Sequence, residues 1–316
     1  MNSNTLKPAQ PILNDSLKLN LIYDKISFTI PIKESERMNV IKRISNNDFY
    51  PLIKQVYIDR PDKGRYKNNY EFTYNGNSIS IALYPIKKTN NFVRVEYNPH
   101  KLGKDGRIVL RTFLIALLGR DVVKEIYFSA RVTRLDLTMD IRGLEPHYYI
   151  HKAGVKYGKL NRDDQGQLNS QILGTGKSNC RITFYDKNVE LTSKGKDTED
   201  TPYQRLELRL RNLNCPMAEL DEKLLAHFQK INLFDHSFLE DDRFSDRFKK
   251  NAYKDGFNIV FNKIYNDKRA TLNRYKKYLA DYQVFPISLE GISFEATHKK
   301  ALGSLLHPDY RHRLTH

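Results

Sequence analysis

Short segments that alternate apolar and polar residues recur along the first two thirds of the chain, with longer segments of helical spacing between them. The segment LNLIYDKISFTI at 19–30 has period two and predicts a strand, and SERMNVIKRISNND at 35–48 has the spacing of a helix. Strands are predicted next at 69–75, 78–85 and 92–98. Residues 1–18 are polar, contain Pro8 and Pro11, and predict a flexible lead.

A second set of elements follows and resembles the first. Residues 106–127 have helical spacing and connect to a strand at 131–141, a helical span around 146–160, and strands that include QILGTG, CRITFYDK and YQRLELRLR. Aligning the two sets places Tyr84 opposite Tyr185, Glu96 opposite Glu207, and Ser27 opposite Asp136. We interpret this as an internal duplication, although short strands rich in Ile, Tyr and Arg also resemble one another by coincidence.

The predicted fold class is therefore α+β, with two pseudo-repeated antiparallel-sheet units whose helices pack on one face. The first unit is assigned to 19–128 and the second to 129–214. From 215 to 316 the pattern is helical and dense in Lys, Arg and Tyr, with helices predicted at 218–231, 243–265, 268–282 and 296–306. Both units keep a Tyr and a Glu, but only the second carries the Asp. If one unit is catalytic, we expect the second.

Three strands of the second unit each have one apolar and one polar face, since side chains alternate along a strand. If the strands share one sheet and one core, Asp136, Tyr185 and Glu207 lie together on its polar side. The polar positions of the three strands are, in chain order, Arg134, Asp136, Thr138, Asp140; Arg181, Thr183, Tyr185; and Arg205, Glu207, Arg209, Arg211.

This inventory suits phosphoryl transfer by a protein nucleophile. Two carboxylates can share a divalent cation, guanidinium groups stabilise charge on phosphate oxygens, and a phenol can attack. A phenol has a pKa of ~10 and must be activated at neutral pH. Lys187 is expected on the same side of the strand as Tyr185, where its positive charge would activate the phenol. The alternative is structural: such carboxylates and arginines commonly form cross-strand ion pairs, which we favour for Asp140 and Arg211, and Tyr185 is one of 20 tyrosines.

Other catalytic centres are not supported by the sequence. Nine His and two Cys show no zinc-ligand spacing. The segment GTGKSN at 174–179 does not match the nucleotide-binding loop GxxxxGK[ST]. Its glycine-rich turn and Lys177 are instead expected to present backbone N–H groups and a charge to a DNA phosphate.

Composition points to a polyanion as the partner. The chain has 53 Lys and Arg against 37 Asp and Glu, a formal charge of +16, with 36 Tyr and Phe and no Trp. Many bacterial proteins are basic without such a role. The longest apolar run, FLIALL at 113–118, is too short to span a bilayer, and the N-terminus does not resemble a secretory signal. With two cysteines only, a reducing cytoplasm is expected.

The order VTRLDLTMD, LGTGKSNCRITFYDKNVEL and YQRLELRLRNL, together with FVRVEYNPHKL upstream, resembles rolling-circle replication initiators of plasmids and filamentous phages. The resemblance spans roughly residues 90–215. It implies a tyrosine that cleaves one strand at an origin, stays on the 5′ phosphate and leaves a 3′ hydroxyl, with Mg²⁺ or Mn²⁺. When the family's motif positions are transferred to this sequence, the resemblance implies that Tyr185 is the nucleophile with Lys187 beside it, and that Asp136 and Glu207 are metal ligands. The paired-histidine motif of the wider nickase superfamily is missing, so the third ligand is open, and Asp140 is our candidate.

The expected partner is origin DNA, single-stranded at the nick site, with host helicase and polymerase and a homodimer as further partners. Phosphate contacts are expected from Lys177, Arg134, Arg181, Arg205 and Arg209. Residues 215–316 are the candidate for origin recognition or dimer contacts. The alternatives are an initiator that binds without cutting, a relaxase or transposase with the same chemistry, and a protein that coats single strands.

Overall fold

A computed structural model describes residues 18–45, 53–56, 65–145, 148–264, 268–283 and 294–305. The chain divides into two compact units. Among the described residues, unit 1 comprises those of 18–21, 138–209 and 225–283, and unit 2 comprises those of 22–137, 210–224 and 294–305. The lead predicted at 1–18 lies outside the described residues, apart from its last residue, which begins a strand. Within the described chain, no helix is both long and apolar enough to cross a membrane.

Unit 2 is built on an antiparallel sheet with the strand order β2-β3-β4-β5-β1-β6. The register of β1 and β5 sets Ser27 opposite Glu96. The predicted strands of the first repeat are confirmed, and β2 is an addition that the hydrophobic pattern did not indicate. The bounds are β1 Lys18–Ile30, β2 Ile53–Val56, β3 Tyr66–Tyr74, β4 Asn77–Pro85, β5 Val93–Tyr97 and β6 Arg131–Arg142, of which 131–137 belong to unit 2.

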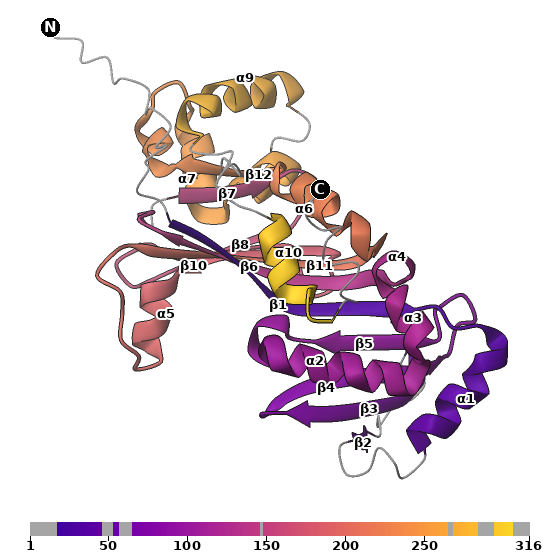
Figure 1. Ribbon diagram of the computed structural model, residues 1–316. Helices are drawn as coiled ribbons and strands as arrows, with labels where there is room; N and C mark the ends of the chain where they lie inside the picture. The colour runs from indigo at the N-terminus through magenta and orange to yellow at the C-terminus, as the bar shows by residue number, and fades with distance from the viewer. Residues whose placement is uncertain are drawn as a thin grey trace, which may run out of the picture. The chain divides into compact units, whose positions relative to one another are not determined.

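Helix α2, Pro99–Leu118, lies along the sheet of unit 2 (Figure 1). It begins where the Asn98 side chain accepts a hydrogen bond from the Lys101 backbone N–H, and its apolar face is buried. Phe113 stacks on Phe72 of β3 at a ring separation of 5.4 Å. The helix predicted at 106–127 is interrupted by Gly119, whose φ of 92° favours glycine. The other helices of this unit are α1 Glu34–Ser45, α3 Arg120–Lys124, α4 Ile126–Ser129, a 3₁₀ turn at Met217–Glu219, the start of α6 Leu220–Phe228, and α10 Phe294–Leu302.

Unit 1 repeats the strand order of unit 2. Its sheet runs β6-β11-β10-β9-β8, which corresponds strand for strand to β1-β5-β4-β3-β2, and this correspondence supports the inferred duplication. β7 and β12 pair antiparallel as a separate two-stranded sheet. The bounds are β7 Tyr148–Lys152, β8 Gly158–Arg162, β9 Leu168–Leu173, β10 Cys180–Asp186, β11 Tyr203–Pro216 and β12 Ile231–Asp235.

The helix predicted around 146–160 is wrong, because the described part of this span forms β7 and β8. Its apolar residues form a run too short to distinguish a helix from a strand, and Gly154 turns the chain with a φ of 81°. Long-range contacts then select the strand. The Gln171 side chain of β9 accepts a hydrogen bond from the Ile150 N–H at 3.0 Å and donates one to the Tyr148 carbonyl at 2.5 Å.

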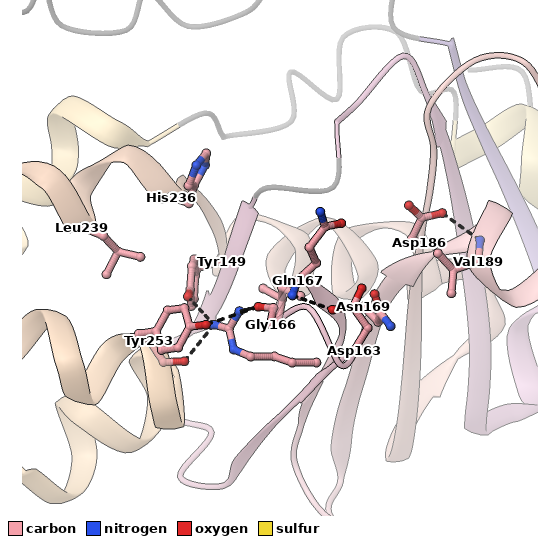
Figure 2. A pocket seen from close by; sticks show the side chains of 12 residues that line it. Tyr149, Asp163, Gly166, Gln167, Asn169, Asp186, Val189, His236, Leu239 and Tyr253 are labelled. Atoms are coloured by element: carbon pink, nitrogen blue, oxygen red, sulfur yellow. Dashed lines mark hydrogen bonds between the residues drawn. The ribbon is translucent and has the colours of Figure 1, made fainter.

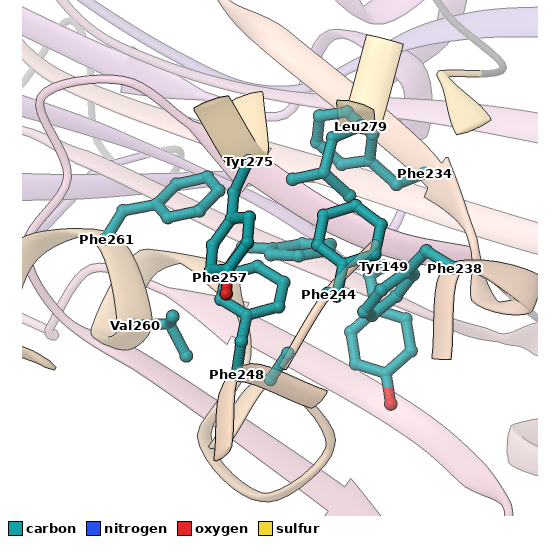
Figure 3. Packing of buried hydrophobic residues seen from close by; sticks show 11 residues of the cluster. Tyr149, Phe234, Phe238, Phe244, Phe248, Phe257, Val260, Phe261, Tyr275 and Leu279 are labelled. Atoms are coloured by element: carbon teal, nitrogen blue, oxygen red, sulfur yellow. The ribbon is translucent and has the colours of Figure 1, made fainter. Parts of the chain in front are cut away.

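An aromatic core joins the helical segments of unit 1 that follow β12 (Figure 3). Phe257 packs at 4.9 Å from the Phe238 ring and 5.1 Å from the Phe234 ring, and all three rings are buried. The described part of the predicted helical C-terminal region is mostly helical, apart from the end of β11 and β12. Of its described residues, those of 225–283 belong to unit 1 and the others to unit 2. The helices are α5 Lys187–Ser193, η4 His236–Glu240, α7 Asp246–Asp255, α8 Phe257–Ile259, a π-helical turn at Val260–Ile264, α9 Arg269–Leu279 and η6 Ala280–Tyr282.

Candidate active site

Tyr185 lies near the end of β10 and donates a hydrogen bond of 2.9 Å to the Glu207 Oε1 atom on β11. The alternation predicted from sequence is confirmed in both strands. Phe184 and Leu208 are buried, while Tyr185 and Glu207 are partly exposed. The sheet of unit 1 therefore brings together two of the predicted site residues, a phenol and a carboxylate able to accept its proton.

Burial raises the pKa of the Tyr185 phenol well above its usual value, and the nearby Glu207 charge and the hydrogen bond to it raise that pKa further. Arg205 acts in the opposite direction but does not reverse the shift. The phenol consequently keeps its proton at neutral pH. Any attack by its oxygen requires a base at the hydroxyl, and Glu207 is already in that position.

Lys187 does not lie on the extended strand from which its action on the phenol was predicted. β10 ends at Asp186, whose side chain caps α5, so Lys187 is the first residue of a helix rather than part of an extended strand. Its ammonium group binds Glu190 and lies 6.0 Å from the centre of the Tyr185 ring. Burial opposes ionisation of Glu190, but hydrogen bonds from Lys187 and Lys194 hold its pKa at about 2. Lys187 is thus placed beside the ring and is already paired.

Asp140 forms a two-point ion pair with Arg205 across β6 and β11. The Arg205 Nε and Nη2 atoms donate to the two carboxylate oxygens at 2.6 and 3.1 Å, and only 4% of the Asp140 side chain is exposed. Arg205 also donates to the Tyr203 hydroxyl at 3.0 Å. This is the cross-strand ion pair that we favoured for Asp140. Tyr203 was not among the predicted site residues, although its position two residues before Arg205 places it on the same face of the strand.

Asp136 belongs to unit 2, where both of its oxygens accept from Arg134, at 2.9 and 2.6 Å. In the described parts of the chain, no group of three or more His, Cys, Asp or Glu side chains is arranged to hold a metal ion. Two of the three predicted ligands are therefore engaged by arginine, and a preformed protein cage for a metal does not fit these residues. Glu207 still offers a hard oxygen donor. Mg²⁺ commonly takes one or two carboxylates together with substrate phosphate oxygens, and a site of that kind requires no cage.

The predicted phosphate-binding turn forms, but three of its six amides donate within the turn. The N–H groups of Thr175, Lys177 and Ser178 donate to side-chain or carbonyl oxygens of the same turn. Lys177 itself is exposed. Arg181 is half-buried, and its Nε atom has no partner, whereas Arg209 takes part in further interactions. Lys177 and Arg181 stay predicted DNA contacts, while Arg134 and Arg205 already bind carboxylates.

The equivalent positions of the first repeat lack the tyrosine–glutamate bond. Tyr84 has a φ of 61°, is 37% exposed, and points its hydroxyl to the Met38 sulfur at 3.9 Å. Glu96 instead accepts from Lys25 at 3.2 Å and from Arg94 at 2.6 Å. The first repeat thus has both residue types without the pairing that a phenol nucleophile needs. It provides matched control positions in the same protein.

No protein-family model matches the chain, and no curated protein matches its sequence. Among solved structures, a similar one is that of a rolling circle replication initiator protein from Geobacillus stearothermophilus. It is 16% identical, and the match covers 79% of this chain and 96% of that chain with a TM-score of 0.37.

Proposed function

We propose that this protein is a replication initiator that nicks one strand of origin DNA, with Tyr185 as the nucleophile. The observation that carries the proposal is the hydrogen bond from the Tyr185 hydroxyl to Glu207, near the end of a strand in the sequence context FYDK. The basic charge of +16 suits a DNA partner, and the motif order described above resembles that of rolling-circle initiators. In an initiator that only binds DNA, the pairing of Tyr185 with Glu207 would have no catalytic role.

In the proposed reaction the Tyr185 oxygen attacks a backbone phosphorus atom as Glu207 accepts the phenol proton. A new tyrosine–phosphorus bond forms, and the bond from phosphorus to the 3′ oxygen breaks. The 5′ phosphate then stays on the protein, and the leaving 3′ oxygen takes up a proton to become the hydroxyl that primes synthesis. The role of Glu207 is to accept the proton from the nucleophilic oxygen as that oxygen attacks.

Mg²⁺ or Mn²⁺ is part of the proposal as a cofactor that arrives with the DNA. The Glu207 carboxylate has a second oxygen besides the one that accepts from Tyr185; that oxygen would hold the ion from the protein side, and phosphate oxygens and water would complete the coordination. When bound, such an ion supplies charge stabilisation to the phosphate oxygens.

The proposed nicking activity can be tested without knowledge of the origin sequence. Incubating the protein with a random-sequence single-stranded DNA library and Mn²⁺, followed by denaturing purification, recovers only covalently attached strands. We expect a protein-linked fragment attached through its 5′ end, and sequencing of the captured fragments to reveal one preferred cut site. Absence of any linked DNA, with tight binding retained, would favour an initiator that binds without cutting.

Glu207→Gln is expected to slow formation of the linked fragment by about 100-fold, because it removes a general base while keeping the shape of the side chain. The rate is measured from the appearance of the protein–DNA adduct on denaturing gels. The matched control is Glu96→Gln in the first repeat, which should leave the rate unchanged. Equal rates for Glu207→Gln and the wild type would remove Glu207 from the proposed mechanism.

A further inference from the structure

A pocket with a volume of about 240 Å³ lies within unit 1, beside the end of β10 (Figure 2). Tyr149 and Tyr253 lie at one end of the pocket and Asp186 and Val189 at the other, with Gln167 between them. It is smaller than the ~300 to 1,000 Å³ typical of pockets that enclose a whole ligand. It therefore has room for one flat ring system rather than for an extended molecule.

The aromatic end of the pocket is held in place by Arg162 of β8. Its guanidinium group stacks on the Tyr253 ring at 3.8 Å and donates hydrogen bonds to the Tyr149 hydroxyl at 2.7 Å and the Tyr253 carbonyl at 2.8 Å. Tyr253 is nevertheless 44% exposed. Arg162 covers one face of the ring, and a stacking partner would therefore use the opposite face.

Polar groups in the pocket suit the hydrogen-bonding edge of a base. Gln167 and Asn169 line it with amide side chains, each offering both donors and an acceptor. Asp163 is held beside them because its carboxylate accepts from the Gln165 and Gln167 backbone N–H groups at 3.0 and 2.8 Å. Leu168 and Leu239 add apolar surface. An aromatic face with adjacent amides is the chemistry by which proteins hold an unstacked nucleobase.

The pocket is also close to Tyr185 along the chain. Asp186, the next residue, lines the pocket, and Val189 of the following helix does so with an exposed side chain. Neighbouring side chains of a strand point to opposite faces, so the Tyr185 hydroxyl and the pocket lie on different sides of the end of β10. A single strand with its phosphate at Tyr185 would pass over this end before a base reached the pocket.

We propose that this pocket binds one nucleobase of single-stranded DNA, a few nucleotides from the phosphate at Tyr185, by stacking on Tyr253. The identity of the nucleic acid rests on the proposed function, whereas the pocket chemistry does not. Alanine substitution of a stacking aromatic weakens binding of single strands by ~1 to 3 kcal/mol per base, which corresponds to at least about fivefold. Tyr253→Leu should therefore lower the affinity for a short oligonucleotide by about tenfold.

The test uses the full chain carrying Tyr185→Phe, so that DNA is bound but not cut. Thymidine oligonucleotides that carry one 5-iodo-deoxyuridine are irradiated on this protein, because that base crosslinks to an aromatic ring stacked on it. We expect a crosslink that maps to Tyr253 and is lost in Tyr253→Leu. The control Tyr157→Leu changes an exposed tyrosine of unit 1 that does not line the pocket and should keep the crosslink.

Three outcomes would overturn the inference. The crosslink could map only to other residues, or it could persist in Tyr253→Leu. Alternatively, free 5-iodo-deoxyuridine monophosphate could crosslink as efficiently as the oligonucleotide, and this result would indicate a site for free nucleotides. None of these readouts depends on cleavage. A failure of the nicking proposal and a failure of this one are therefore distinguishable.

Discussion

Tyr185→Phe should reduce formation of the protein-linked 5′ fragment by at least about a thousandfold, because the substitution removes only the oxygen that forms the covalent bond. The fold should tolerate the change. The phenol lies near the end of a strand, partly exposed, and its one described hydrogen bond is to Glu207. Binding of single-stranded DNA should remain within about threefold of the wild type, since phosphate contacts supply most of the affinity. The adduct is quantified on denaturing gels and binding by fluorescence anisotropy.

Tyr84→Phe is the matched control for this experiment. Tyr84 holds the aligned position in the first repeat, but its hydroxyl points to Met38 and not to a carboxylate. We expect unchanged adduct formation. If Tyr84→Phe abolished the adduct and Tyr185→Phe did not, the nucleophile would belong to the first repeat, and the argument from the Glu207 hydrogen bond would be wrong.

Asp140→Ala should lower the free energy of unfolding by about 3 to 5 kcal/mol, since it leaves a largely buried Arg205 charge without its partner. The Arg205 side chain is only 20% exposed, so water cannot fully replace the hydrogen bonds that its guanidinium group makes to the lost carboxylate. The measurement is urea denaturation followed by circular dichroism. The substitution also tests the metal assignment, because a cation ligand would show its effect mainly on the Mn²⁺ dependence of adduct formation.

Two control variants separate the effect of burial on the free energy of unfolding from the effect of an unpaired charge. Glu199→Ala breaks the ion pair with Arg142, in which the two side chains are 36% and 31% exposed, and should cost less than about 1 kcal/mol. The double variant Asp140→Ala, Arg205→Met should recover most of the stability, since no buried charge is left unpaired. A small effect of Asp140→Ala, equal to that of Glu199→Ala, would show that Arg205 reaches solvent.

The strands were predictable from sequence because their alternation is local. Leu135 and Leu137 of β6 are buried as period two indicates, and the same rule placed Tyr185 and Glu207 on a shared polar face before any register was known. The hydrogen bond between the two side chains follows from that face and from the pairing of neighbouring strands. What local pattern alone could not show is which tyrosine of 20 has a carboxylate beside it.

The failures concern features that depend on distant residues. The span at 146–160 forms strands because β12, about eighty residues later, and Gln171 satisfy the backbone of β7. The pairing of Arg205 with Asp140 arises because β6 and β11 are neighbours in the sheet, which the sequence pattern does not show. The pocket that Tyr253 lines joins residues from five separate segments of unit 1. No sequence period identifies such a pocket.

Mass spectrometry of the adduct identifies the attached side chain itself. After nuclease treatment and proteolysis of the protein–DNA adduct, we expect one modified peptide, that of strand β10, with a nucleotide joined through its 5′ phosphate to the Tyr185 oxygen. A nucleotide on any other side chain, or one joined through a 3′ phosphate, would contradict the proposed mechanism.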